Sequence, residues 1–86
     1  MNIKELISII KKKIEQNITV ESINIEDKTF LHKKHLSHDI NKFHLKLIIK
    51  SNELQKMKKI ESTKKIYNII SKELKEYIHS IQISII

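Results

Sequence analysis

The sequence predicts an α+β fold in two layers, with the order α-β-β-α-α-β and helices on one face of a three-stranded sheet. Apolar residues recur with a helical period in two segments, one early and one late in the chain. Between them and at the end, apolar and polar residues alternate as in strands. Each helical segment has one apolar face, which requires a second layer to cover it. We expect residues 1–86 to form one domain.

Residues 2–16 are expected to form the first helix, because isoleucine and leucine recur on one side while lysine occupies the others. Asn17 is expected to end this helix in the left-handed conformation that often follows a helix. A run rich in β-branched residues then predicts a strand at about 20–27.

The segment 28–42 interrupts both periods and is expected to be a polar, histidine-rich loop. It contains His32, His35 and His38. Loops of this length in compact domains are usually functional or disordered, so this one is a candidate site.

Residues 43–50 alternate as a half-buried strand, with Phe43, Leu45, Leu47 and Ile49 on its apolar side. His44 falls on the polar side of this strand, where we expect it to be exposed.

The C-terminal part of the chain predicts two further helices and a last strand. Ser51 or Asn52 is expected to cap a short helical turn that reaches about Lys58. A long helix is expected to begin at Ser62 and to end at Ile78, and alternating isoleucines predict the closing strand at 81–85.

Composition excludes several classes of function. No apolar run approaches the roughly 20 residues needed to span a bilayer, and without cysteine there is no disulfide, thiolate nucleophile or thiolate metal ligand. Metal chemistry would rest on the five histidines or on carboxylates. The first residues show no secretory or transit pattern, so we expect a cytoplasmic location, or a mitochondrial one if the chain is a processed form.

Catalytic motifs are also missing. The sequence contains no nucleophile elbow, phosphate loop or dinucleotide fingerprint. Its acidic residues fall at expected exposed helix positions or beside lysines, where pairing within a helix explains them. We therefore expect a protein that is not an enzyme.

Three segments resemble the BolA family. Residues 23–32 are similar to the family's leucine-glutamate-valine-x-aspartate-glutamate-serine stretch with a histidine beyond it. Residues 43–51 are similar to its histidine-phenylalanine-lysine and valine-rich strand ending in serine. The third segment resembles the valine-tyrosine, glutamate-glutamate-leucine and isoleucine-histidine-alanine-leucine motifs through Ile66-Tyr67, Lys72-Glu73-Leu74 and Ile78-His79-Ser80-Ile81. The resemblance implies the same α-β-β-α-α-β fold, which is related to type II KH domains.

The resemblance also implies a partner and a cofactor. Members of the family pair with monothiol glutaredoxins and share a [2Fe–2S] cluster, to which the glutaredoxin brings a cysteine and a glutathione thiolate. Carried over, the first ligand from this chain is His79 and the second is His32, with His35, His38 and His44 as alternatives. Imidazole nitrogen is a suitable ligand for iron, and two histidines on one iron raise the potential of the cluster. The apo protein is expected to be a monomer without a cofactor.

The alternative function is nucleic-acid binding by a KH-like domain with a basic surface. The net charge is +7, and the lysines expected to contact phosphate are Lys56, Lys58, Lys59 and Lys64. However, the chain has no glycine for the GxxG loop of KH domains, and Ser62-Thr63-Lys64 replaces the family's arginine-histidine-arginine. At least three of Phe30, Phe43, Tyr67 and Tyr77 are expected to lie in the core, so any binding should be weak and salt-sensitive.

Overall fold

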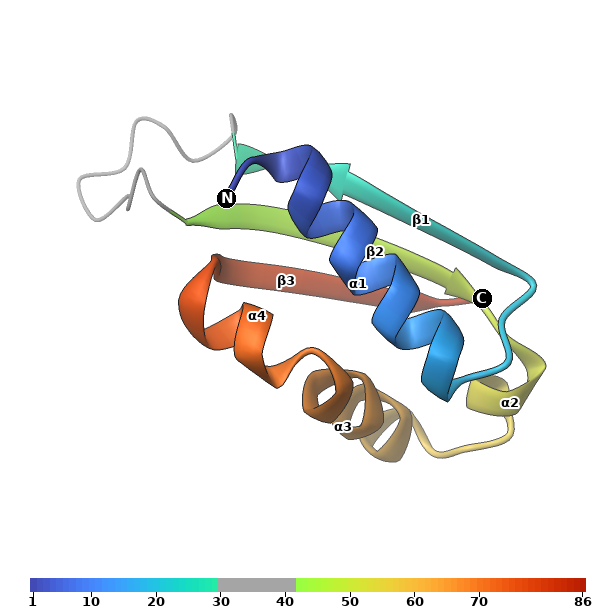
Figure 1. Cartoon of the computed structure of the whole chain (residues 1–86). Helices are drawn as coiled ribbons and strands as arrows, with labels where there is room; N and C mark the ends of the chain where they lie inside the picture. The colour runs from blue at the N-terminus through green and yellow to red at the C-terminus, as the bar shows by residue number, and fades with distance from the viewer. Residues whose placement is uncertain (30–41) are drawn as a thin grey trace.

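The computed structural model describes residues 1–29 and 42–86, and Figure 1 shows the path of the chain. The elements of these residues are α1 (Ile3–Asn17), β1 (Ser22–Asp27), β2 (Phe43–Lys50), α2 (Asn52–Gln55), α3 (Lys59–Ile69), α4 (Ser71–Glu76) and β3 (Ile78–Ile85). The predicted α+β class and three-stranded sheet are confirmed. The long late helix, however, is two helices.

The sheet has the strand order β1-β2-β3, in which β1 runs antiparallel to β2 and β3 runs parallel to it. Ile25, Leu47 and Ile83 form one row across the three strands on the apolar face. Asn24, Ile48 and Ser84 form a row with the opposite side-chain parity. One face of the sheet therefore belongs to the core, and the other is largely polar.

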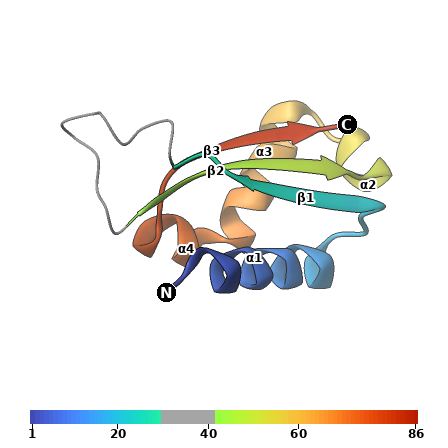
Figure 2. The ribbon, with the colours of Figure 1, turned by 90° about the horizontal axis from the view of Figure 1, so that it is seen from above.

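Helix α1 covers the apolar face of the sheet. Its residues Leu6, Ile10 and Ile14 are completely buried. Figure 2 shows α1 and α4 on the same side of the sheet, while α3 runs obliquely past the edge formed by β3. The core thus lies between the helices and the sheet, as the one-sided apolar stripe of residues 2–16 requires.

The predicted left-handed residue at Asn17 is wrong. Asn17 is the last helical residue, and its side-chain amide donates to the carbonyl of Lys13 at 2.7 Å. No described residue has a positive φ. The next residue, Ile18, is extended (φ −138°, ψ 139°) and buried. The extended conformation of Ile18 directs the chain toward β1, so the helix ends without a left-handed turn.

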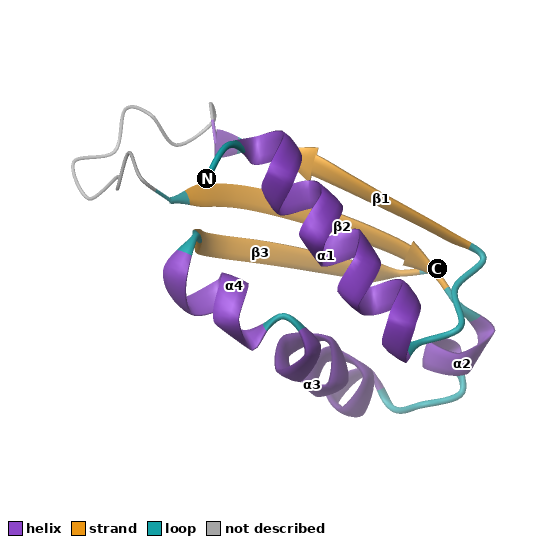
Figure 3. Cartoon of the chain, viewed as in Figure 1, coloured by secondary structure: helices purple, strands orange, loops and turns teal. Residues whose placement is uncertain are grey.

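The long helix expected from Ser62 to Ile78 begins earlier, is interrupted and ends earlier. Helix α3 begins at Lys59, and the chain leaves helical geometry at Ile70 (φ −108°, ψ 23°) before α4 starts. Figure 3 shows this interruption as a short loop between the two helices. Ile70 is completely buried, so the turn points this side chain into the core while α4 takes a new direction.

Strand β3 begins at Ile78, which was expected to be helical. The amide of Phe43 donates to the carbonyl of Tyr77 at 2.9 Å, so pairing with β2 starts before the isoleucine alternation does. The Ser51 cap is confirmed, because its hydroxyl accepts from the amide of Leu54 at 3.2 Å.

Candidate functional site

The candidate site lies at the end of the sheet where β2 and β3 begin. His79 is the second residue of β3 and is exposed, whereas the preceding Ile78 is buried. The parallel ladder pairs Phe43 with Ile78 and then His44 with Ser80. His79 is therefore the extra residue of a β-bulge, an irregularity that commonly re-aims side chains near functional sites.

His44 lies directly beside His79. The two imidazole ring centroids are 4.7 Å apart, with the planes tilted by 45°. His44 Nδ1 and Ser80 Oγ are 2.7 Å apart and share a hydrogen bond. The structure thus brings together His44 on β2 with His79 and Ser80 on β3.

The prediction that His44 is exposed is wrong, because only 5% of its surface is accessible. The bulge places both His79 and Ser80 opposite this residue. The His44 backbone is also held, since its carbonyl accepts from the Lys28 amide at 2.7 Å and its amide donates to Thr29 Oγ1 at 3.2 Å. Strand alternation alone does not reveal this burial, because it depends on a register shift between distant segments.

The remaining ligand candidates, His32, His35 and His38, lie outside the described residues. The chain enters their segment after Thr29, whose hydroxyl contacts the His44 amide, and leaves it at Lys42, which precedes β2. Both flanks of the segment therefore lie at the end of the sheet that carries His79. Within residues 1–29 and 42–86, no three histidine or carboxylate side chains are grouped as metal ligands.

A pocket of about 350 Å³ adjoins His44 and Ser80, and its lining also includes Lys28, Lys46 and Gln82. Lys28 also forms an ion pair with Glu26 at 2.8 Å. The hydrogen bond and positive charge of Lys28 hold the pKa of the Glu26 carboxyl below its ordinary value of 4.5. Two lysines therefore line this pocket, and the charge of one of them, Lys28, is balanced by Glu26.

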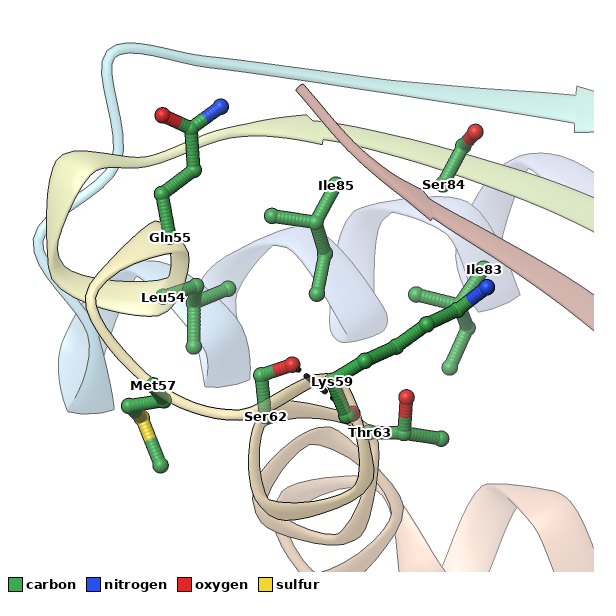
Figure 4. Close-up of a pocket in the computed structure, with 9 residues that line it drawn as sticks. All are labelled: Leu54, Gln55, Met57, Lys59, Ser62, Thr63, Ile83, Ser84 and Ile85. Carbon is green, nitrogen blue, oxygen red and sulfur yellow. Dashed lines mark hydrogen bonds between the residues drawn. The ribbon is translucent and has the colours of Figure 1, made fainter.

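The lysines considered for nucleic acid lie elsewhere. Lys56, Lys58, Lys59 and Lys64 are all exposed, on the α2–α3 connection and on α3. A pocket of about 320 Å³ separates this region from the end of β3, and in Figure 4 the Lys59 side chain extends toward Ile83.

The aromatic residues only partly follow the expectation of a core location. Phe43 and Tyr77 pack against the core, and Phe30 lies outside the described residues. Tyr67, in contrast, is 40% exposed on α3. This exposure could have been suspected, since Tyr67 directly follows the buried Ile66 and so points away from the apolar stripe.

None of the described helices has both the length and the apolar composition to cross a bilayer.

Fold and site together define a small α+β domain, with an exposed histidine at a strand bulge and a polar sheet face. The sequence profile of BolA-like proteins matches residues 14–86. The chain therefore belongs to the BolA-like protein family. Comparison with curated protein sequences gives no match.

Solved structures show the same fold. The BolA domain of SufE1 from Arabidopsis thaliana is 24% identical, with a TM-score of 0.77 over 99% of this chain and 92% of that one. BolA1 from Arabidopsis thaliana is 21% identical, with a TM-score of 0.75 over 91% and 86% of the two chains. A bol-like protein from Babesia bovis is 11% identical, with a TM-score of 0.70 over 92% and 80% of the two chains.

Proposed function

We propose that this chain acts without enzymatic activity, as the BolA-like partner of a monothiol glutaredoxin with which it shares a [2Fe–2S] cluster. Membership of the BolA-like family supports the proposal. The observation that carries it is the position of His79, an exposed imidazole on a strand that is paired with the centre of the sheet. A ligand held in this way needs little reorganisation when a partner approaches.

The donor atoms of the chain fit a cluster that is shared between two proteins. The chain has no cysteine, so it would supply imidazole nitrogen, which binds iron. His79 is one accessible nitrogen ligand, and His32, His35 or His38 would supply the second. His44 is less suited to be the second ligand, because it is buried and already bonded to Ser80. Thiolates that complete the cluster would come from the glutaredoxin and glutathione.

The charge of the chain supports docking on an acidic surface. Its net charge is +7, and Lys28 and Lys46 line the pocket beside His44. Lysines around a site speed association with a partner of opposite charge and make it sensitive to salt.

The test is to mix the chain anaerobically with cluster-loaded monothiol glutaredoxin and to record visible absorption and circular dichroism. The parent chain should change the cluster spectrum, whereas His79→Ala should stay folded and leave the spectrum that of the glutaredoxin alone. Ser84→Ala is the matched control, because Ser84 belongs to the same strand and pairs with Ile48, away from the histidines. A His79→Ala spectrum identical to that of the parent mixture would show that His79 is not a ligand.

Nucleic-acid binding is a second candidate function, and the exposure of Tyr67 is the observation that favours it. Tyr67 lies on α3, the helix that carries Lys64, so a base-stacking surface and a phosphate contact share one element. The absence of a glycine-containing loop limits this function to weak contacts through charge.

A further inference from the structure

The bulge in β3 changes which residues of the strand face each side of the sheet. Ile78 and Ile81 both belong to the core, although they are three positions apart and a regular strand would place them on opposite faces. The extra residue between them allows both to face the helices. As a consequence, His79 and Ser80 are both left on the side of His44.

His44 is held through both its ring and its backbone. Its Nδ1 is bonded to Ser80 Oγ at 2.7 Å, and its backbone is held by Thr29 and Lys28. Only 5% of the residue is accessible. A buried ring with a hydrogen bond of this kind keeps one orientation.

His79 rests on this ring. The separation of 4.7 Å between ring centroids lies within the range of direct ring contacts. One side of the His79 imidazole is therefore against His44, while the residue as a whole stays exposed. An exposed histidine without such a ring contact would sample several rotamers, most of which would point its nitrogens away from a docked partner.

We infer that His44, locked by Ser80, is a positioning residue that holds the imidazole of His79 in the orientation needed to bind an iron centre presented by a partner. This inference rests on the proposed function for its purpose, but the ring arrangement can be measured in the apo chain alone. Ordering one side chain on binding weakens an interaction by about 2- to 10-fold, so loss of the ring contact with His44 should weaken the shared-cluster complex by that factor.

Two variants test the contributions of Ser80 and His44 separately. Ser80→Ala removes only the hydroxyl that holds His44, and His44→Ala removes the imidazole ring that contacts His79. Ser84→Ala is the matched control, because Ser84 belongs to the same strand and pairs with Ile48, away from the histidines. Ser80→Thr keeps the hydroxyl and should behave as the parent does.

The first measurement is NMR of the apo chain, which reports the mobility of the His79 ring through its carbon-bound protons and their relaxation. We expect a restricted ring in the parent, Ser80→Thr and Ser84→Ala, and a rotamer-averaged ring in Ser80→Ala and His44→Ala. If His44→Ala leaves the His79 ring as restricted as in the parent, the positioning role is overturned, and if Ser80→Ala does so, the part assigned to Ser80 is overturned.

The second measurement is the complex with cluster-loaded glutaredoxin. Ser80→Ala should dissociate about 2- to 10-fold more readily and should change the visible circular dichroism, while Ser80→Thr restores both. Parent-like behaviour of Ser80→Ala in a mixture where His79→Ala abolishes the cluster signal would refute positioning and leave the proposed function intact. If the parent itself gives no cluster signal, the proposed function fails, and a ring loosened in apo Ser80→Ala still supports the positioning role.

Discussion

Removal of the Lys13 ammonium should strongly destabilise the fold, because Lys13 compensates a buried carboxylate. Lys13 Nζ on α1 lies 2.7 Å from Glu73 Oε2 on α4. The Glu73 side chain is 4% exposed and that of Lys13 is 37% exposed. Glu73 Oε1 is buried without a hydrogen-bond partner among the residues that the structure describes. In Lys13→Met, the carboxylate would therefore remain buried without its counter-ion.

The size of the effect lies between two limits. An exposed ion pair contributes about 0–1 kcal/mol, whereas unpairing a fully buried charge costs about 3–5 kcal/mol. Because only Glu73 is fully buried, we expect Lys13→Met to lower the free energy of unfolding by about 2–3 kcal/mol. The whole domain should be stable by about 4–13 kcal/mol, so this is a large fraction.

Urea unfolding followed by far-ultraviolet circular dichroism measures the effect. With a slope of about 1 kcal/mol per molar urea, the midpoint of Lys13→Met should fall by about 2–3 M. Lys12→Met is the control, since Lys12 is an exposed neighbour on the same helix. The double variant Lys13→Met with Glu73→Met should regain most of the lost stability, because an apolar pair can replace a buried ion pair at little cost. If Lys13→Met unfolds at the same urea concentration as Lys12→Met, the reasoning is wrong.

Three further outcomes are expected. The Lys65 ammonium, followed by the Thr19 amide, lowers the pKa of Glu53 below 4.5. The stabilising contribution of the Glu53 carboxylate is therefore present above that pH and lost on acidification. Glu53→Gln should flatten the acid side of a stability–pH curve measured by urea unfolding. Binding to labelled oligonucleotides should be weak and nearly vanish at physiological salt, with Lys64→Gln reducing the salt slope by about one, and sequence-selective binding that survives such salt would favour the nucleic-acid function. Dialysis against a chelator should leave the circular dichroism spectrum unchanged, and loss of the folded signal would instead reveal a structural metal.

The sequence predicts those elements whose residues are periodic over their full length. Strand β2 has the predicted bounds, and α1 is displaced by a single position, because alternation and the helical stripe each continue to the end of the element. The interruption at Ile70 does not appear in the stripe, since Ile66, Ile70 and Leu74 keep a helical spacing of four residues across it. Local spacing therefore identifies the apolar residues but not the change of helix direction.

The candidate site is only partly accessible to sequence reasoning. The resemblance to the BolA family selects His79, and the structure places it on a paired strand. The contact with His44 and the bond from Ser80 depend on a register shift between segments that are far apart in the chain. Neither a motif nor a period reports such a shift, because each is a property of one segment.

The bulge at His79 has a consequence for changes in chain length. If the residue were deleted, Ile78 and Ile81 would become two positions apart, and ordinary alternation would bring both to the core without any bulge. A shortened chain should therefore fold as well as the parent, whereas an insertion after Ile81 would turn Ile83 and Ile85 outward. The core does not require an extra residue between Ile78 and Ser80, so the packing of the isoleucines does not explain the presence of His79.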